Sequence, residues 1–172
     1  TGWVTAAVQD GCLQRVRYTG KPVDLPVGMT TYQNGIALTF TRPLRKDVAE
    51  SVGSFHLEQW NYRYAAAYGS TEYRVSNPRE QGRDAVLVRS ATLLDERTVF
   101  LEIADLKPVH QLAIAWSLLA EDEASLRQTL YATINRIGTE SIAEDRLNRT
   151  SVAGTVADAA LRSGLLLKFQ QG

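Results

Sequence analysis

The sequence predicts an all-β protein folded as an antiparallel sandwich, and three observations support this prediction. Apolar and polar residues alternate with a period of two over most of residues 13–135, and this period places alternate side chains on opposite faces of a strand. Turn signals such as Asn-Gly, Arg-Pro and short acidic runs separate the alternating segments. Roughly seven to nine short strands follow one another without long helices between them, which is typical of an antiparallel sandwich.

The first predicted hairpin spans residues 29–41. Asn34-Gly35 suits a two-residue turn, because both residue types tolerate the positive φ that such turns need. Beyond the turn, one face of the strand is apolar and carries Ile36, Leu38 and Phe40. The strand is expected to end at Arg42-Pro43, because proline has no N–H to donate to a neighbouring strand.

The remaining strands are predicted from the same alternation and turn signals. A second hairpin covers residues 84–103 with a polar tip, and two more strands cover residues 112–118 and 130–134 on either side of an acidic turn. Further strands are expected at residues 13–18, 54–64 and 71–76. Pro22 and Pro26 are expected to mark extended linkers.

The pattern changes after Arg136. Ser141 and Glu144 have the spacing of a capping box, in which a hydroxyl and a carboxylate bind the free amides at a helix start. Residues 152–163 can form a helical stripe, and the glycine that follows them suits a helix stop. The sequence therefore predicts a C-terminal extension of short helices. The apolar residues within 165–169 are expected to dock on the sandwich or to contact a partner.

Composition and charge exclude several classes of function. Lys plus Arg and Asp plus Glu both number 19, so the formal net charge is zero and no concentrated positive field is present to attract nucleic acid. Cys12 is the only cysteine, which excludes an intrachain disulfide and a metal site built on paired thiolates. No apolar run reaches the length of roughly 18 residues that a membrane-spanning helix needs.

Few residues suit catalysis or cofactor binding. His56 shares a predicted strand face with Glu58, so an acid–base or metal pair is geometrically allowed there, whereas His110 follows a turn at the start of a strand. An exposed strand face is the simpler interpretation of both histidines. Phosphate-binding glycine loops and the CxxCH motif of covalent haem are absent. We expect no catalytic residue, no cofactor and no metal; an enzyme would need a pocket that holds one of these histidines beside carboxylates.

One aromatic cluster stands out from the rest of the sequence. On a strand, Trp60, Tyr62 and Tyr64 would lie on one face at intervals of roughly 6.6 Å, a flat ladder on which sugar rings could stack. Asn61 and Arg63 would then form a hydrogen-bonding rim, and Tyr68 is included in the candidate ligand-binding set. The alternative is that the aromatic rings pack between the sheets or under the turn that follows, as amphipathic aromatic side chains commonly do.

Three motifs resemble a known bacterial family: residues 13–22 (LQRVRYTGKP), 58–64 (EQWNYRY) with 68–70 (YGS), and 82–86 (GRDAV). They are similar to the module that follows the β-propeller in large secreted bacterial proteins labelled haem-binding or membrane-bound dehydrogenases, whose propeller resembles glucose/sorbosone dehydrogenases. The resemblance implies a secreted, periplasmic or cell-surface location. It assigns no catalytic residue to this chain, because oxidoreductase or haem function would belong to other domains of the parent protein.

A second resemblance concerns the fold. Residues 35–44, 90–93 and 98–101 look like the strands of bacterial immunoglobulin-like domains, so an immunoglobulin-like sandwich is implied. The expected segments are residues 1–13 as the end of a preceding domain or a linker, 14–137 as the sandwich, and 138–172 as the C-terminal extension.

The leading functional hypothesis is a non-catalytic accessory module that supports neighbouring domains or contacts a protein partner. Two alternatives remain open. The first is a carbohydrate-binding module that uses the aromatic strand face. The second is a fragment of a sugar-dehydrogenase-like or haem-binding oxidoreductase.

Overall fold

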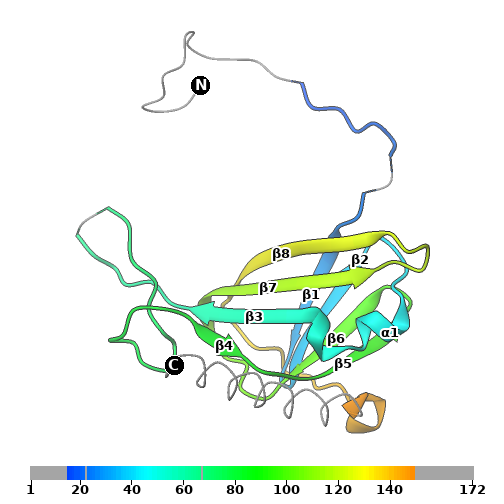
Figure 1. The fold of residues 1–172 in the computed structure, drawn as a ribbon. Helices are drawn as coiled ribbons and strands as arrows, with labels where there is room; N and C mark the ends of the chain where they lie inside the picture. Colours follow the sequence, from blue (N-terminus) through cyan, green and yellow to red (C-terminus); the bar gives the residue numbers. More distant parts are fainter. Residues whose placement is uncertain (1–14, 22, 67, 150–172) are drawn as a thin grey trace, which may run out of the picture.

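The computed structural model describes residues 15–21, 23–66 and 68–149, and it confirms the predicted all-β sandwich. Two antiparallel sheets of four strands each face one another, and helical structure in the described residues is limited to three short segments (Figure 1). The first sheet has the strand order β1-β2-β6-β5, and the second has the order β4-β3-β7-β8. These orders correspond to the ABED and C′CFG sheets of an immunoglobulin-like sandwich.

The strands of the first sheet are β1 (Pro26–Tyr32), β2 (Gly35–Phe40), β6 (Thr98–Ile103) and β5 (Val88–Asp95). Those of the second sheet are β4 (Asp84–Val86), β3 (Phe55–Trp60), β7 (Val109–Leu119) and β8 (Ser125–Ile134). The helical segments are α1 (Lys46–Ala49), η1 (Val52–Ser54) and η2 (Glu144–Arg146).

β1 and β2 form the predicted first hairpin, but its turn lies one residue earlier than Asn34-Gly35. Tyr32 pairs with Gly35, so Gln33 and Asn34 form the turn. Gly35 is needed inside the strand for a different reason: a Cβ at this position would lie 2.1 Å from the carbonyl oxygen of Leu101. The absence of a side chain permits this close approach of β2 to β6.

The other strand predictions have mixed outcomes. The β7–β8 hairpin forms as expected, and β5 and β6 form the predicted second hairpin with its polar tip. Only the first residues of that segment differ, because β4 pairs with β3 in the other sheet. Residues 15–18 lie outside any strand, and in residues 71–76 only Tyr73 is paired, through isolated bridges. Pro26 begins β1 and is not part of a linker, because an edge strand tolerates a residue without an N–H.

The two sheets meet through a pair of aromatic rings. Phe40 on β2 and Trp116 on β7 have ring centroids 5.4 Å apart and an interplanar angle of 85°, which is an edge-to-face contact. Both rings are buried. In antibody domains, a disulfide links these two strands, and this chain has no cysteine on either of them. Within the described residues, β2 and β7 are therefore joined across the core by noncovalent contacts, this ring pair among them.

Residues 137–149, here called the strap, lie against the outer face of the first sheet. The helix predicted to start at Ser141 is reduced to the single turn η2, which has no side-chain cap. The Ser141 hydroxyl donates a hydrogen bond to Oε1 of Gln33 (3.3 Å), so it is engaged by the first hairpin and does not cap a helix. The helix predicted at residues 152–163 and the apolar run at 165–169 lie outside the described residues.

The strap is fixed by reciprocal hydrogen bonds to the turn of the first hairpin. Asn34 Nδ2 donates to the carbonyl of Ile142 (2.8 Å), and Asn34 Oδ1 accepts from the amide of Ile142 (3.0 Å). The amide of Gln33 donates to the carbonyl of Glu140 at 2.7 Å. Ile142 then packs on Ala37 and Phe100, two apolar residues on the outer face of the sheet. The strap thus buries a surface that would otherwise be exposed to water.

The far end of the strap covers a buried carboxylate. Glu102 on β6 accepts hydrogen bonds from Ser90 Oγ (2.7 Å) and from Arg149 Nη2 (2.8 Å). Burial alone would raise the pKa of Glu102, but the hydrogen bonds from Arg149 and Ser90 outweigh it and hold the pKa below its ordinary value. Glu102 is therefore ionised, and its charge is paired within the fold.

Candidate functional site

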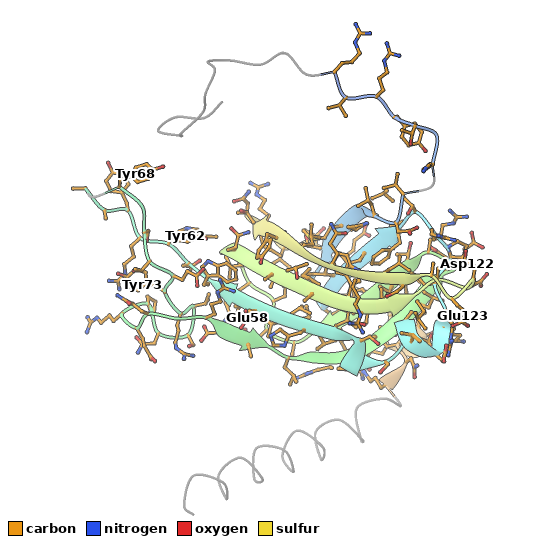
Figure 2. All side chains as sticks on the ribbon, turned by 45° about the horizontal axis from the view of Figure 1, so that its top comes forward. Glu58, Tyr62, Tyr68, Tyr73, Asp122 and Glu123 are labelled. Atoms are coloured by element: carbon orange, nitrogen blue, oxygen red, sulfur yellow. The ribbon has the colours of Figure 1, made fainter. Side chains whose placement is uncertain are left out.

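The connection between β3 and β4 is the most prominent feature outside the sandwich. These residues, 61–83, are called the tyrosine arm, and Figure 2 shows its described residues, 61–66 and 68–83, extending away from the body of the protein with Tyr62 and Tyr68 on the projecting part. Tyr64 and Tyr68 are exposed to 104% and 105% of their reference areas. Residues 64–71 contain no charged side chain. The tip of the arm is therefore uncharged and carries two fully exposed aromatic rings.

The base of the arm is held by backbone pairing. Asn61 and Tyr73 exchange two backbone hydrogen bonds of 2.8 Å each, and Tyr73 also forms a bridge with Gln81. The guanidinium of Arg63 lies over the Tyr73 ring, 4.3 Å from its centroid, and it donates to the carbonyl of Pro78. The arm is thus an ordered extension of the second sheet at its base.

His110, at the start of β7, holds the point where the arm leaves the sheet. Its Nδ1 accepts a hydrogen bond from the amide of Tyr62 (2.9 Å), and the His110 amide donates to Oδ1 of Asn61 (2.9 Å). The imidazole also stacks on the Tyr62 ring, with centroids 6.4 Å apart and an interplanar angle of 15°. Because Nδ1 of His110 already accepts the hydrogen bond from the Tyr62 amide, this imidazole nitrogen serves to position the arm.

Arg83 connects the base of the arm to β3 through contacts with Trp60, Glu72 and Glu58. Its guanidinium lies 3.9 Å from the centroid of the Trp60 ring. It donates to both carboxylate oxygens of Glu72 at 2.7 Å and to Glu58 at 3.1 Å. The hydrogen bond and charge of Arg83 hold the pKa of Glu72 below its ordinary value, and the two carboxylates raise the pKa of Arg83 above its own.

The predicted ladder of Trp60, Tyr62 and Tyr64 does not form. β3 ends at Trp60, so the two tyrosines do not continue the same strand face. Trp60 is only 2% exposed, because Arg83 covers its ring and Tyr131 meets it edge-on at 6.4 Å. Its indole N–H is buried without an acceptor among the described residues.

The other members of the predicted set have different roles. Asn61 and Arg63 make hydrogen bonds within the base of the arm, as described above. Tyr62, Tyr64 and Tyr68 present exposed ring surface. The alternation of apolar and polar residues gave no signal for Arg83 or His110, although Arg83 lies within the GRDAV motif quoted above.

The pH dependence of the arm base follows from the lowered pKa of Glu72. A carboxylate whose pKa falls on folding stabilises the fold above its unfolded pKa, near 4.5, and this contribution is lost as the pH falls through the lower folded value. We expect amide NMR signals of Asn61 and Tyr73 to show ordered pairing at neutral pH and loosening below pH 4.5. The Glu72→Gln variant, which cannot titrate at this position, should lack this step; a step of the same size in the variant would contradict the assignment to Glu72.

Two surface depressions and the remaining histidine lie outside the tyrosine arm. His56 Nε2 lies 3.8 Å from Glu58 Oε1, and His56 lines an open depression of about 370 Å³ with Arg127 and Trp116. A second depression, of about 510 Å³, includes Glu102 and Arg149. Within the described residues, no three His, Cys, Asp or Glu side chains are grouped so that they could hold a metal ion. None of the described helices is long and apolar enough to cross a membrane.

Comparisons with protein families, with curated proteins and with solved structures found no match to this chain.

Proposed function

We propose that this chain is a non-catalytic interaction module that contacts a protein partner through the tip of the tyrosine arm. The observation that supports the proposal is the full exposure of Tyr64 and Tyr68 on a segment without charge. Large exposed aromatic rings gathered in one place are typical of contact surfaces. Following the sequence resemblance, we place the module within a larger secreted or periplasmic bacterial protein, where the partner is a neighbouring domain or a separate protein.

The chemistry of the tip fits protein recognition. It reads Tyr-Ala-Ala-Ala-Tyr-Gly-Ser-Thr, and tyrosine with small residues is the composition that binding loops of antibodies use. Tyrosine contributes a large contact area and has few side-chain torsions to immobilise on binding. The ordered base lowers the entropy that the arm loses when its tip docks.

The tip is tested by a double variant, Tyr64→Ala with Tyr68→Ala, in the parent protein. A photo-crosslinking amino acid at position 64 or 68 should capture the partner in the native host, and mass spectrometry identifies it. Tyrosines at the centre of an interface commonly contribute at least about 2 kcal/mol, so the double variant should weaken binding to the purified partner by about thirtyfold or more.

Tyr18→Ala is the matched control, because Tyr18 is also an exposed tyrosine but lies outside the arm. It should bind as the wild-type chain does. Equal affinity of the double variant and the wild type would contradict the proposal.

A second candidate function is carbohydrate binding by stacking on Tyr62, Tyr64 and Tyr68. Its support is the exposure of all three rings. The burial of Trp60 and the internal hydrogen bonds of Asn61 and Arg63 count against it. Quenching of tyrosine fluorescence by a glycan, lost in the Tyr64→Ala Tyr68→Ala variant, would favour carbohydrate as the ligand and displace the protein partner.

A further inference from the structure

Three of the four sheet edges are protected against pairing with another chain. β1 begins with a proline and has a register shift between Pro26 and Gly28. β4 is only three residues long. β5 has two register shifts, and the carboxylate of Glu50 accepts a hydrogen bond from the amide of Leu93 on this strand. Prolines, bulges, short strands and covering groups are the devices by which proteins block pairing at sheet edges.

The fourth edge, β8, is less protected among the described residues, because its one register shift against β7 lies between Val109 and Leu112, at one end of the pairing. It is ten residues long, and its pairing with β7 is regular from Ala132 to Ser125. It contains no proline, glycine or lysine, and Arg127 is its only charged residue. Figure 1 shows β8 outermost in its sheet, beyond β7. Among the described residues, no backbone hydrogen bond outside the β7–β8 ladder involves β8.

We propose that β8 pairs antiparallel with β8 of a second copy of this chain, which joins two four-stranded sheets into one continuous sheet. A free row of amide and carbonyl groups over this length is a template for another strand. The inference is independent of the tyrosine arm and adds a self-association surface to the module.

The sequence of β8 is compatible with pairing to itself. In an antiparallel pair, directly opposed residues point to the same face of the sheet. The two-fold axis that relates the two copies must therefore lie between one residue of β8 and the same residue of the second copy. With the axis at Thr129 or at Leu130, most residues of β8 are paired with residues of the second copy. They place Arg127 opposite Tyr131 or Thr133 of the copy, so the single charge of the strand never meets its own equivalent. A positively charged side chain opposite an aromatic or a threonine side chain is favourable or neutral.

The geometry also leaves both tyrosine arms free. The arm leaves the second sheet beside His110, close to where β8 ends, because Val109 pairs with Ile134. A two-fold axis through the middle of β8 therefore directs the two arms to opposite ends of the joined sheet.

The test is the oligomeric state of the full chain by sedimentation equilibrium. The wild type should dimerise reversibly, and Thr129→Lys should raise the dimer dissociation constant at least tenfold. This substitution places two positive charges opposite or diagonal to each other across the axis. The matched control is Ala85→Lys, which introduces the same charge on the exposed outer face of β4, the opposite edge of the same sheet. It should leave the dissociation constant unchanged.

A second measurement does not depend on how well the lysine variant folds. Spin labels on Thr129→Cys, in a Cys12→Ser background, should give a short distance between copies, because opposed residues lie about 5 Å apart across paired strands. Labels on Ala85→Cys should lie farther apart. A chain that stays monomeric up to about 1 mM, the weakest range of specific association, overturns the proposal. So does a dimer that Thr129→Lys does not weaken, or one whose labels are no closer at position 129 than at position 85.

Discussion

A Phe40→Ala variant should unfold with a free energy about 3–5 kcal/mol below that of the wild-type chain, the cost typical of truncating a fully buried phenylalanine. Phe40 is 1% exposed and contacts Trp116 edge-to-face across the sandwich. Truncation removes the apolar contact area of the ring and leaves a cavity between the sheets, which the surrounding β-structure can fill only partly. The variant also loses the aromatic pair, which adds to the effect of burial.

Chemical denaturation in urea, followed by tryptophan fluorescence, measures this difference. Tyr64→Ala is the control, since it removes an aromatic ring of similar size from a fully exposed position, and its free energy of unfolding should match the wild type within about 0.5 kcal/mol. A loss below 1 kcal/mol in Phe40→Ala would show that Phe40 is not a principal contact between the sheets.

The second large effect is expected from shortening the chain. A protein ending at residue 137 lacks all but the first residue of the strap, and we expect it to be about 3–5 kcal/mol less stable than one ending at residue 149. Loss of the strap exposes Phe100 and removes Ile142, and each buried side chain of this size contributes about 1.5–3 kcal/mol. It also removes the hydrogen bonds of Asn34 with Ile142 and leaves Glu102 without Arg149.

Thermal denaturation of the two shortened proteins gives the comparison directly. The protein ending at residue 149 retains every described contact of the strap and serves as the control. Binding of a dye such as ANS should rise in the protein that ends at residue 137, because the outer face of the first sheet becomes accessible. Equal melting temperatures and equal dye binding would mean that the strap contributes little to the stability of the sandwich.

The alternation of apolar and polar residues predicted the strands that place one face in the core between the sheets. Leu38, Leu101 and Ile114 lie on such faces and are 0% exposed, so the period of two is visible in the sequence. The burial of the outer face of β2 and β6 under the strap is an additional feature. The turn of the first hairpin was misplaced by one residue because Gly35 serves the close contact with Leu101, a requirement that is set by β6 and not by the turn itself.

The strap and the base of the arm could not be predicted in this way, because they depend on individual contacts between distant parts of the chain. Asn34 and Ile142 are 108 positions apart in sequence, and neither carries a local signal of their mutual hydrogen bonds. In the same way, Arg83 covers Trp60 only after β4 has paired with β3. The aromatic cluster indicated the place of the candidate site, but strand periodicity placed Trp60 on one face with Tyr62 and Tyr64, whereas β3 ends at Trp60 and only the tyrosines beyond it are exposed.

The contact between Phe40 and Trp116 also determines how the fold responds to redox conditions. Since the two sheets are joined by noncovalent packing of aromatic rings, thiol reductants have no bond to cleave between β2 and β7. Oxidative folding catalysts are likewise not needed to bring these strands together. The sandwich can therefore reach and keep its native packing in a reducing cytosol as well as in an oxidising extracellular space.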